Sequence, residues 1–312
     1  MKAARIHRYG GNEVVVIEEI AMPIAGLGEV LVKVHGAAVN PVDWKIREGY
    51  MSQMLPVEFP YTLGCDVSGT IVSLGAGVSS FTVGDAVYGY PNLMRCGAFA
   101  EAIVMQASEL ANAPQSIELA HAAALPVAVI TAYDGLFTHG GLQAAQRVLI
   151  LGGAGGVGSA AIQLAKWRGA EVFATASARN QNALRSLGAN PIDYGSQATA
   201  DLVRDVDLIF DCVGVESGIA ALPSLKRGGT YVTTVYALPE PTMLAQYDAR
   251  PVMFGIQPSG GRLAEIAAIV DQGGLKMAID QVFSLDQTAE ALAASQAGRT
   301  RGKILIRPES NR

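Results

Sequence analysis

The stretch RVLILGGAGGVGSAAIQLAKW, residues 147–167, decides the fold of this chain. Residues 147–151 form a short, mostly apolar run, which is typical of a strand buried on both faces of a parallel sheet. The glycines after it fit the pattern G-x-G-x-x-G, and apolar residues then recur at helical spacing until Gly169, where a helix C-terminal glycine is expected. A strand, a glycine turn and a helix in this order predict a dinucleotide-binding unit.

Each glycine of this turn has a physical task in such a unit. Gly153 permits the tight turn, Gly155 lets backbone N–H groups approach a pyrophosphate, and Gly158 lets the helix pack close to the strand. The helix N-terminus adds N–H donors and a partial positive charge. An ordinary glycine turn, or a site for a nucleotide-like ligand such as S-adenosylmethionine, is the alternative. The residues expected to contact the cofactor here are Gly153, Ala154, Gly155, Gly156, Val157 and Gly158.

The next predicted strand, over residues 171–177, bears on which dinucleotide is bound. An NAD site usually has an acidic residue about 20 residues further on, where it accepts a hydrogen bond from the ribose 2′-OH. No acid occurs between Val172 and Ile192. Ser177 can hydrogen-bond a 2′-phosphate and Arg179 can bind it through charge-assisted contacts, with a solvated loop arginine as the alternative. The sequence therefore favours NADP(H).

The middle of the chain continues with alternating strands and helices. A short helix that ends at Gly188 is followed by strands over residues 206–210 and 230–235. This alternation predicts an α/β fold with a doubly wound parallel sheet. Cys212 and Val213 follow a strand at the sheet edge where such folds bind ligands, so we expect them to line the cofactor site.

The outer parts of the chain have a different pattern. In the first 110 residues, short strands such as residues 29–34 are separated by regularly spaced glycines, which predicts a compact β-barrel-like domain. The last sixty residues contain helical segments over 263–270 and 286–296 and a closing strand over 303–307. The sequence thus predicts two domains of different character.

Length and composition exclude several classes of protein. The 312 residues suggest two domains at about 150 residues each. Half of the residues are hydrophobic, 16% are charged and the mean hydropathy is +0.28, which excludes a disordered chain. The net charge of −5 provides no basic field for nucleic acid or an anionic membrane surface. No apolar run suits a membrane span or a secretory signal, and three scattered cysteines imply no disulfide framework, so we expect a cytoplasmic protein.

Six ordered motifs support a resemblance to a known family. They are NPVD at 40–43 with Arg47 and Gly49, GCDVSG at 64–69, VGDAV at 83–87, AALP at 123–126 running to TAY at 131–133, the glycine turn, and GKI at 302–304. With these motifs the chain resembles the medium-chain dehydrogenase/reductase superfamily over nearly its whole length. Within it, the chain is similar to the zinc-independent quinone oxidoreductases of the zeta-crystallin type.

The resemblance implies an architecture and an activity. A GroES-like β-barrel catalytic domain over residues 1–120, completed by residues 252–312, is interrupted by a Rossmann domain over residues 121–251. The implied activity is an NADPH-dependent transfer of hydride to a quinone or another conjugated carbonyl, an enone or enal. Relatives often pair through the edge of the Rossmann sheet, so we expect a homodimer that uses residues 230–235.

The chain departs from the zinc-binding branch of this superfamily. In the alcohol dehydrogenases a Cys, a His and a further Cys or acid hold a catalytic zinc. Here Asn40 matches the first position and Cys65 the second, with Asp66 beside it, and the four-cysteine structural zinc lobe is absent. Because a catalytic zinc needs three protein ligands and an open position, we expect no metal. Without a Lewis acid, acceptors that take hydride easily are favoured.

The resemblance also implies site residues. Candidate donors to the acceptor oxygen are the Asn40 amide, the Tyr50 hydroxyl and Arg47. Asp43 is expected to orient one of them or to relay a proton; for Asn40 and Asp43, turn chemistry after a strand is the alternative. Thr131, for which helix packing is the alternative, is expected near the nicotinamide. Gly302 and Lys303 are carried over more loosely as cofactor-binding residues.

Two other functions stay open from the sequence. One is a zinc-dependent alcohol dehydrogenase with atypical ligands, which metal analysis would reveal. The other is a non-enzymatic NADPH-binding protein such as a redox sensor, since fold alone does not fix function.

Overall fold

The computed structural model describes residues 1–196 and 198–308, which divide into two compact units. The first unit comprises Met1–Val127, Gln257–Gly273 and the described residues from Ala278 on, and the second comprises Ala128–Ile256 and Gly274–Met277. Residues 121–127, expected in the Rossmann domain, thus belong to the first unit. Residues 252–256 and 274–277 belong to the second unit rather than the first.

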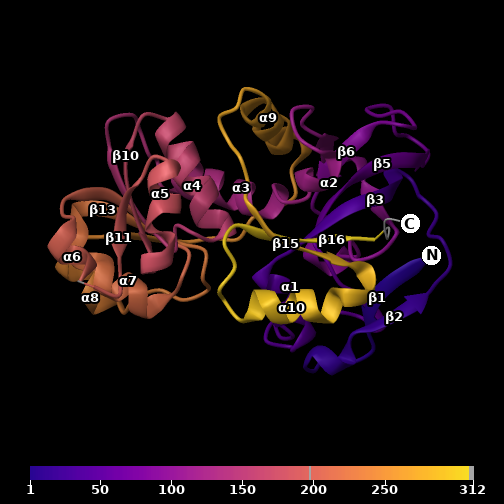
Figure 1. Cartoon of the computed structure of the whole chain (residues 1–312), viewed down its shortest axis with the longest axis horizontal. Helices are drawn as coiled ribbons and strands as arrows, with labels where there is room; N and C mark the ends of the chain where they lie inside the picture. Colours follow the sequence, from indigo (N-terminus) through magenta and orange to yellow (C-terminus); the bar gives the residue numbers. More distant parts are fainter. Residues whose placement is uncertain (197, 309–312) are drawn as a thin grey trace. The chain divides into compact units, whose positions relative to one another are not determined.

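A parallel sheet forms the centre of the second unit (Figure 1). Its strands lie in the order β11 (Asn190–Asp193), β10 (Glu171–Ala176), β9 (Arg147–Leu151), β12 (Val206–Asp211), β13 (Leu225–Thr233) and β14 (Arg250–Met253). Neighbouring strands pair in parallel throughout. This is the strand order of the Rossmann fold. Successive strands are added on one side of β9 up to β11, and from β12 on they are added on the other side, so the order reverses between β9 and β12. The carboxyl ends of these two strands therefore mark the expected ligand site.

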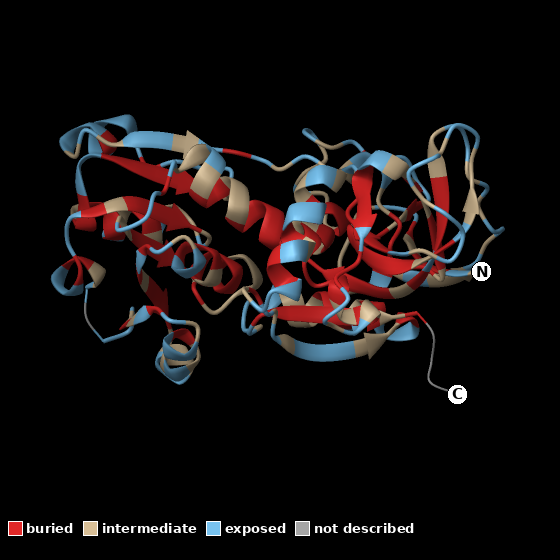
Figure 2. Cartoon of the chain, turned by 90° about the horizontal axis from the view of Figure 1, so that it is seen from above, coloured by how far each residue is buried: buried red, intermediate tan, exposed pale blue. Residues whose placement is uncertain are grey.

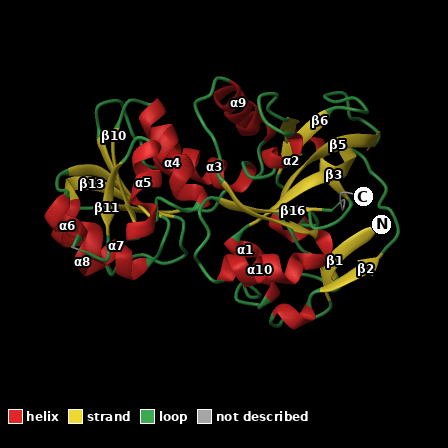
Figure 3. Ribbon diagram, in the orientation of Figure 1, coloured by secondary structure: helices red, strands yellow, loops and turns green. Residues whose placement is uncertain are grey.

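Helices alternate with the strands of this sheet along the chain (Figure 3). They are α3 (Pro126–Tyr133), which begins at the end of the first unit, α4 (Gly156–Trp167), α5 (Gln181–Ser186), α6 (Thr199–Leu202), α7 (Val215–Ala221) and α8 (Pro241–Gln246). Helix α4 contacts β9 and β10, and its apolar positions Ala161, Leu164 and Ala165 are buried, as their helical spacing predicts. A core cluster that includes Leu149, Ile209 and Tyr231 stabilises the sheet from within.

The edge of this sheet differs from the prediction. Residues 230–235 were expected to form the edge strand, but β13 begins at Leu225 and ends at Thr233, and β14 pairs along its outer side. Among the described strands, β14 is therefore the edge. Strand β14 has only four residues, which are partly exposed and include Pro251. Such a segment lacks the alternation or the apolar run that predicts a strand, and proline within a strand is confined to edges.

The first unit is built mainly from antiparallel strands. One sheet has the order β2 (Val16–Glu19), β1 (Lys2–Ile6) and β4 (Tyr61–Thr62). The other has the order β15 (Ile279–Ser284), β16 (Lys303–Arg307), β3 (Glu29–Val39), β5 (Asp66–Leu74), β6 (Ala86–Gly89) and β8 (Leu110–Asn112), with β7 (Ala102–Gln106) also paired to β3. The C-terminal strand β16 pairs with β3, which returns the end of the chain to its beginning.

Strand β3 organises the core of the first unit. Val30, Val32 and Val34 are fully buried and Lys33 is exposed, as the period of two predicts. Helices α1 (Pro41–Arg47), α2 (Leu119–Ala122), α9 (Gly260–Asp271) and α10 (Thr288–Gln296) surround the sheets. Figure 2 shows the buried strands within each unit. Within residues 1–196 and 198–308, no helix has the length and apolar character that crossing a membrane requires.

Candidate functional site

The glycine turn joins β9 to α4 at the reversal of strand order. A Cβ atom at Gly158 would lie 2.2 Å from the carbonyl oxygen of Gly152, so only glycine permits this approach of helix to strand. At Gly155, by contrast, a Cβ atom would meet only the Gly152 oxygen, at 3.6 Å. Gly155 is thus not required by packing, and its bare backbone leaves room for a ligand. No side chain caps α4 at Gly155, so its first N–H groups suit a pyrophosphate.

Thr175 on β10 holds this turn in place. The Gly152 N–H donates to the Thr175 hydroxyl at 3.1 Å, and the Gly153 N–H donates to its carbonyl oxygen at 2.8 Å. Gly152 has a φ of +79°, which favours glycine. The sequence alone does not indicate this role of Thr175, because the role depends on the pairing of β10 with β9.

Asp211 plays the corresponding role at the end of β12. Its buried carboxylate accepts hydrogen bonds from the Val213 N–H at 2.8 Å, the Gly214 N–H at 3.1 Å and the Tyr231 hydroxyl at 2.6 Å. A Cβ atom at Gly152 would lie 2.8 Å from Val213, so this loop adjoins the glycine turn. Burial raises the pKa of the Cys212 thiol, which therefore stays protonated. This suits the wall of a site rather than a nucleophile.

The residues that are predicted to make the site specific for NADP(H) follow the end of β10. Ser177 is half-buried and follows the last residue of the strand, and Arg179 is exposed in the next turn. Asp193 lies just beyond the segment without acids, on β11, and pairs with Ala176 of β10. Its Oδ1 accepts a hydrogen bond from the Gly195 N–H at 3.0 Å, so this oxygen already has a partner. Thr131 is buried within α3, and its expected contact with the nicotinamide stays a prediction.

The first unit contains a buried polar cluster, which we define as Asn40, Asp43, Cys65, Asp66, Cys96 and Lys303. At its centre the Lys303 ammonium donates to Asn40 Oδ1 at 2.6 Å and to Asp66 Oδ2 at 2.9 Å. The Asn40 Nδ2 donates to Asp66 Oδ2 at 2.8 Å and to the Ala38 oxygen at 3.4 Å. Asp66 Oδ1 accepts from the Val127 N–H at 2.8 Å. Partners thus surround the Asn40 amide on every side, which fits a positioning residue better than a direct donor.

Asp43 occupies the other end of the buried polar cluster. Its Oδ2 accepts from the Asn40 N–H at 2.7 Å, which caps α1, and its Oδ1 accepts from the Cys65 thiol at 3.2 Å. Burial is the main cause that raises the pKa of Asp43 to about 7, so near neutral pH the carboxyl holds its proton about half of the time. A carboxyl group that titrates near neutral pH is able to take part in a proton relay, which is the role predicted for Asp43.

We expect the raised pKa of Asp43 to make the free energy of unfolding depend on pH. Between the ordinary pKa of 3.8 and about 7, the folded state holds a proton on Asp43 that the unfolded state has released. The free energy of unfolding should therefore fall as the pH rises through this window, by a few kcal/mol at about 1.4 kcal/mol per pKa unit. Urea unfolding from pH 4 to pH 8 measures this slope. Asp43→Asn should flatten it, and an unchanged slope in the variant would contradict the assignment.

The structure corrects the expectation for Arg47. Its guanidinium is fully buried, donates to the Gly10 oxygen and the Gln296 side chain, and contacts Asn12 and Glu48. These bonds join the end of α1 to the N-terminal segment and to α10. Arg47 is therefore a structural residue and not a donor to the acceptor. The sequence around Arg47 does not show whether its side chain is exposed or buried, because the partners Gly10, Asn12 and Gln296 are distant along the chain.

Tyr50 remains available as a donor. Its side chain is 73% exposed, and its hydroxyl makes no hydrogen bond to any residue described by the structure. The ring contacts Trp44 edge-on, at 6.1 Å between ring centroids, and this contact holds it beside α1. Its role in catalysis stays a prediction.

Gly302 and Lys303 also differ from the expectation. A Cβ atom at Gly302 would lie 2.2 Å from the Ala278 oxygen, so this glycine serves a close backbone approach. The Lys303 side chain is 5% exposed and its ammonium bonds within the buried polar cluster. Both residues therefore lie in the first unit as packing and positioning groups. These contacts do not fit the prediction that Gly302 and Lys303 bind the cofactor.

The buried polar cluster does not fit a catalytic zinc. Among residues 1–196 and 198–308, no three His, Cys, Asp or Glu side chains are placed to hold a metal ion. Asp66, one of the two potential ligands named from the sequence, is already paired with the Lys303 ammonium. The other is Cys65, and its hydrogen bond with Cys96 and its burial raise the pKa of its thiol, which disfavours the thiolate form that binds zinc.

Two family descriptions match the chain. "Alcohol dehydrogenase GroES-like domain" matches residues 26–115, and "Zinc-binding dehydrogenase" matches residues 187–306. The 2-methylene-furan-3-one reductase of Solanum lycopersicum is 34% identical, over 99% of this chain and 79% of that protein. The chloroplastic NADPH-dependent alkenal/one oxidoreductase of Arabidopsis thaliana is 33% identical, over 99% of this chain and 80% of that protein.

Solved structures agree with these relatives. The quinone oxidoreductase from Coxiella burnetii has a TM-score of 0.91 and 30% identity, over 99% of both chains. The likeness extends over both units, because the match covers 99% of this chain. The chain belongs to the medium-chain dehydrogenase/reductase superfamily, in its group of quinone oxidoreductases of the zeta-crystallin type.

Proposed function

We propose that this oxidoreductase uses NADPH to reduce a quinone or another conjugated carbonyl, an enone or enal, without a metal. The observation that carries the proposal is the ammonium–carboxylate pair of Lys303 and Asp66, which occupies the region where a zinc-dependent relative would need ligands. Without a Lewis acid, an electron-poor acceptor is needed. The relatives named for furanone, alkenal and quinone reduction act on such acceptors.

In this proposal the second unit binds the cofactor. Backbone N–H groups at Gly155 and the start of α4 bind the pyrophosphate, and Ser177 and Arg179 bind the 2′-phosphate. Asp211 orients the loop that contains Cys212 and Val213. When bound, NADPH supplies the hydride.

The first unit supplies groups for the acceptor. The Tyr50 hydroxyl donates a hydrogen bond to the oxygen that gains charge, and Asp43 holds a proton near neutral pH. Asn40 acts through its neighbours, because it caps α1 with Asp43 and fixes the Asp66–Lys303 pair.

The decisive experiment is an NADPH-consumption screen across quinones, enals, enones and simple alcohols, run with and without a chelator. We expect turnover with conjugated acceptors that the chelator does not change. Stoichiometric zinc and chelator-sensitive alcohol oxidation would instead favour the atypical alcohol dehydrogenase. NADPH binding without turnover on any acceptor would favour a redox sensor.

Arg179→Ala should weaken NADPH binding selectively. Loss of a charge-assisted contact to the 2′-phosphate costs about 1.5–3 kcal/mol, which is a roughly 10- to 150-fold change in the dissociation constant. NADH lacks this phosphate, so its affinity should hardly change. Fluorescence titration with both cofactors measures the difference. Equal losses for NADPH and NADH would contradict the role of Arg179.

Tyr50→Phe and Asn40→Ala should lower turnover with a quinone while NADPH affinity stays close to that of the wild type. For Tyr50, removing one donor to a developing charge typically costs about 3 kcal/mol, or about 100-fold in kcat. Asn40→Ala should lower kcat indirectly, because Asn40 positions Asp43, Asp66 and Lys303. Tyr50 is exposed, so its variant should unfold like the wild type, whereas Asn40→Ala should also destabilise the buried polar cluster. Wild-type kcat in both variants would exclude these roles.

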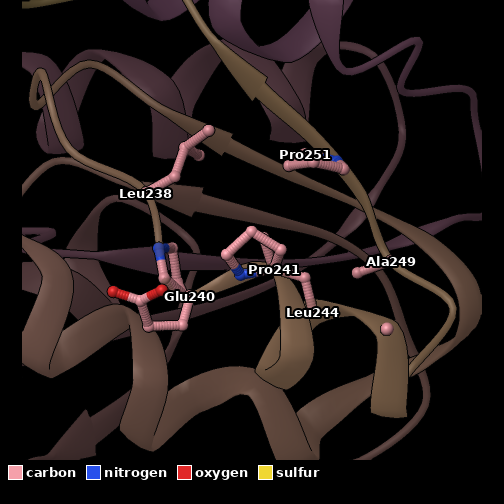
Figure 4. Close-up of a pocket in the computed structure, with 8 residues that line it drawn as sticks. Leu238, Glu240, Pro241, Leu244, Ala249 and Pro251 are labelled. Carbon is pink, nitrogen blue, oxygen red and sulfur yellow. The ribbon is translucent and has the colours of Figure 1, made fainter.

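We also propose a homodimer that pairs through β14 rather than through residues 230–235. Among the strands that the structure describes, β14 pairs only with β13, and Met253 and Tyr236 are exposed nearby. A hollow of about 390 Å³ beside it is lined mainly by apolar side chains between Leu238 and Pro251 (Figure 4). Sedimentation equilibrium tests the mass, and a monomer at all concentrations would exclude the dimer.

A cytoplasmic location is proposed from the sequence. All three cysteines are free, which suits a reducing compartment. Relatives named as chloroplastic or mitochondrial make cell fractionation the necessary test.

A further inference from the structure

Two free cysteines of the buried polar cluster lie in contact. Cys65 precedes β5 and Cys96 precedes β7, and their Sγ atoms are 3.0 Å apart. A disulfide bond is about 2.0 Å long, so a shift of about 1 Å would join them. Neither the mechanism proposed above nor the cofactor site uses Cys96.

The backbone holds the two cysteines in this position. The residue after Cys96, Gly97, and the next, Ala98, both donate N–H hydrogen bonds at 3.0 Å to the oxygen of Gly64, the residue before Cys65. The Phe99 N–H donates to the Leu63 oxygen at 2.9 Å. Because both segments are fixed by bonds next to the cysteines, the sulfur atoms stay close without a covalent link.

The two thiols differ in exposure and in partners. Cys96 is half-buried, whereas Cys65 is fully buried and donates its thiol hydrogen to Asp43 Oδ1 at 3.2 Å. An oxidant from solvent therefore meets Cys96 first. Asp43 Oδ1 orients the Cys65 thiol, which keeps its proton until its sulfur reacts.

We propose that Cys65 and Cys96 form a redox-sensitive pair, which a peroxide oxidises to a disulfide. In the first step Cys96 sulfur attacks hydrogen peroxide; the O–O bond breaks, an S–O bond forms, and water leaves with the thiol proton. In the second step Cys65 sulfur attacks Cys96 sulfur; the S–O bond breaks, and hydroxide takes the Cys65 proton to leave as water. Two thiols and one peroxide thus give one disulfide and two waters.

The disulfide removes a hydrogen bond from the proposed proton-holding group. Once Cys65 has no thiol hydrogen, Asp43 Oδ1 loses its donor. We therefore expect severalfold lower turnover in the oxidised enzyme, with NADPH affinity unchanged because the glycine turn belongs to the other unit. This effect on turnover rests on the proposed function, whereas formation of the disulfide does not.

Peptide mapping after peroxide treatment tests the pair directly. Trypsin cleaves after Arg47, Arg95 and Arg147, so Cys65 lies in peptide 48–95, Cys96 in peptide 96–147, and Cys212 in neither. We expect peptides 48–95 and 96–147 to appear as one cross-linked species whose mass is that of the two peptides less two hydrogens. Dithiothreitol should separate the two peptides, and the cross-link should still form in Cys212→Ser. Cys96→Ser and Cys65→Ala should lack it. Sulfinic or sulfonic acids on separate peptides, or cross-links only through Cys212, would overturn the proposal.

Turnover measured on the same samples separates the two claims. Peroxide should lower wild-type quinone reduction severalfold, dithiothreitol should restore it, and Cys96→Ser should not respond. A cross-link with full turnover would overturn the coupling to Asp43. If the untreated enzyme reduces no quinone or enal, the proposed function fails, while the peptide map still decides the disulfide.

Discussion

Gly155→Ala should weaken NADPH binding by about 10- to 100-fold and leave the free energy of unfolding nearly unchanged. The added Cβ atom meets only the Gly152 oxygen, at 3.6 Å, which is ordinary contact. The protein therefore tolerates the methyl group, but a pyrophosphate that approaches the bare backbone does not. Fluorescence titration with NADPH and denaturant unfolding without it measure the two quantities separately.

Gly158→Ala is the matched control, because it adds the same methyl group three residues along. Here the Cβ atom would lie 2.2 Å from the Gly152 oxygen and 2.8 Å from Gly153 Cα, and neither is a flexible side-chain atom. Strand and helix must separate, which destabilises the second unit by about 1–3 kcal/mol or more. Equal effects of both substitutions on stability would show that Gly155 serves packing rather than the cofactor.

The parts of this protein that could be predicted from the sequence are those with local signals. Residues 147–151 and 303–307 coincide with β9 and β16, because short apolar runs between turn residues carry a strand pattern of their own. The glycine turn could be assigned for the same reason, since strand, turn and helix follow each other directly.

Contacts between distant residues carry no such signal. Asp66 and Lys303 are separated by more than two hundred residues, and nothing in either segment indicates that they pair. The resemblance predicted a donor at Arg47 and a cofactor ligand at Lys303 from the motifs around them, and neither motif indicates that these charged side chains are buried. The pairing of β3 with β5 and β16 places Asn40, Asp66 and Lys303 together, and this pairing is a property of the whole first unit.

Lys303→Met should destabilise the first unit by about 3–5 kcal/mol, which is the usual effect of removing one partner from a buried ion pair. Asp66 would remain fully buried without its ammonium partner. Turnover should fall as well, since Asn40 Oδ1 loses its donor, but NADPH affinity should not. Denaturant unfolding and cofactor titration measure these effects. A loss of NADPH affinity without a loss of stability would return Lys303 to the cofactor site.

The double variant Lys303→Met with Asp66→Asn makes this prediction sharper. It removes both charges, and the amide oxygen of the new asparagine can still accept from the Val127 N–H. A buried charge without a partner is expensive, whereas a neutral pair of similar volume is often tolerated. We therefore expect the double variant to be more stable than Lys303→Met alone, although both lack the ion pair. Additive losses would mean that the charge of Lys303 has no part in fixing Asn40 and Asp66.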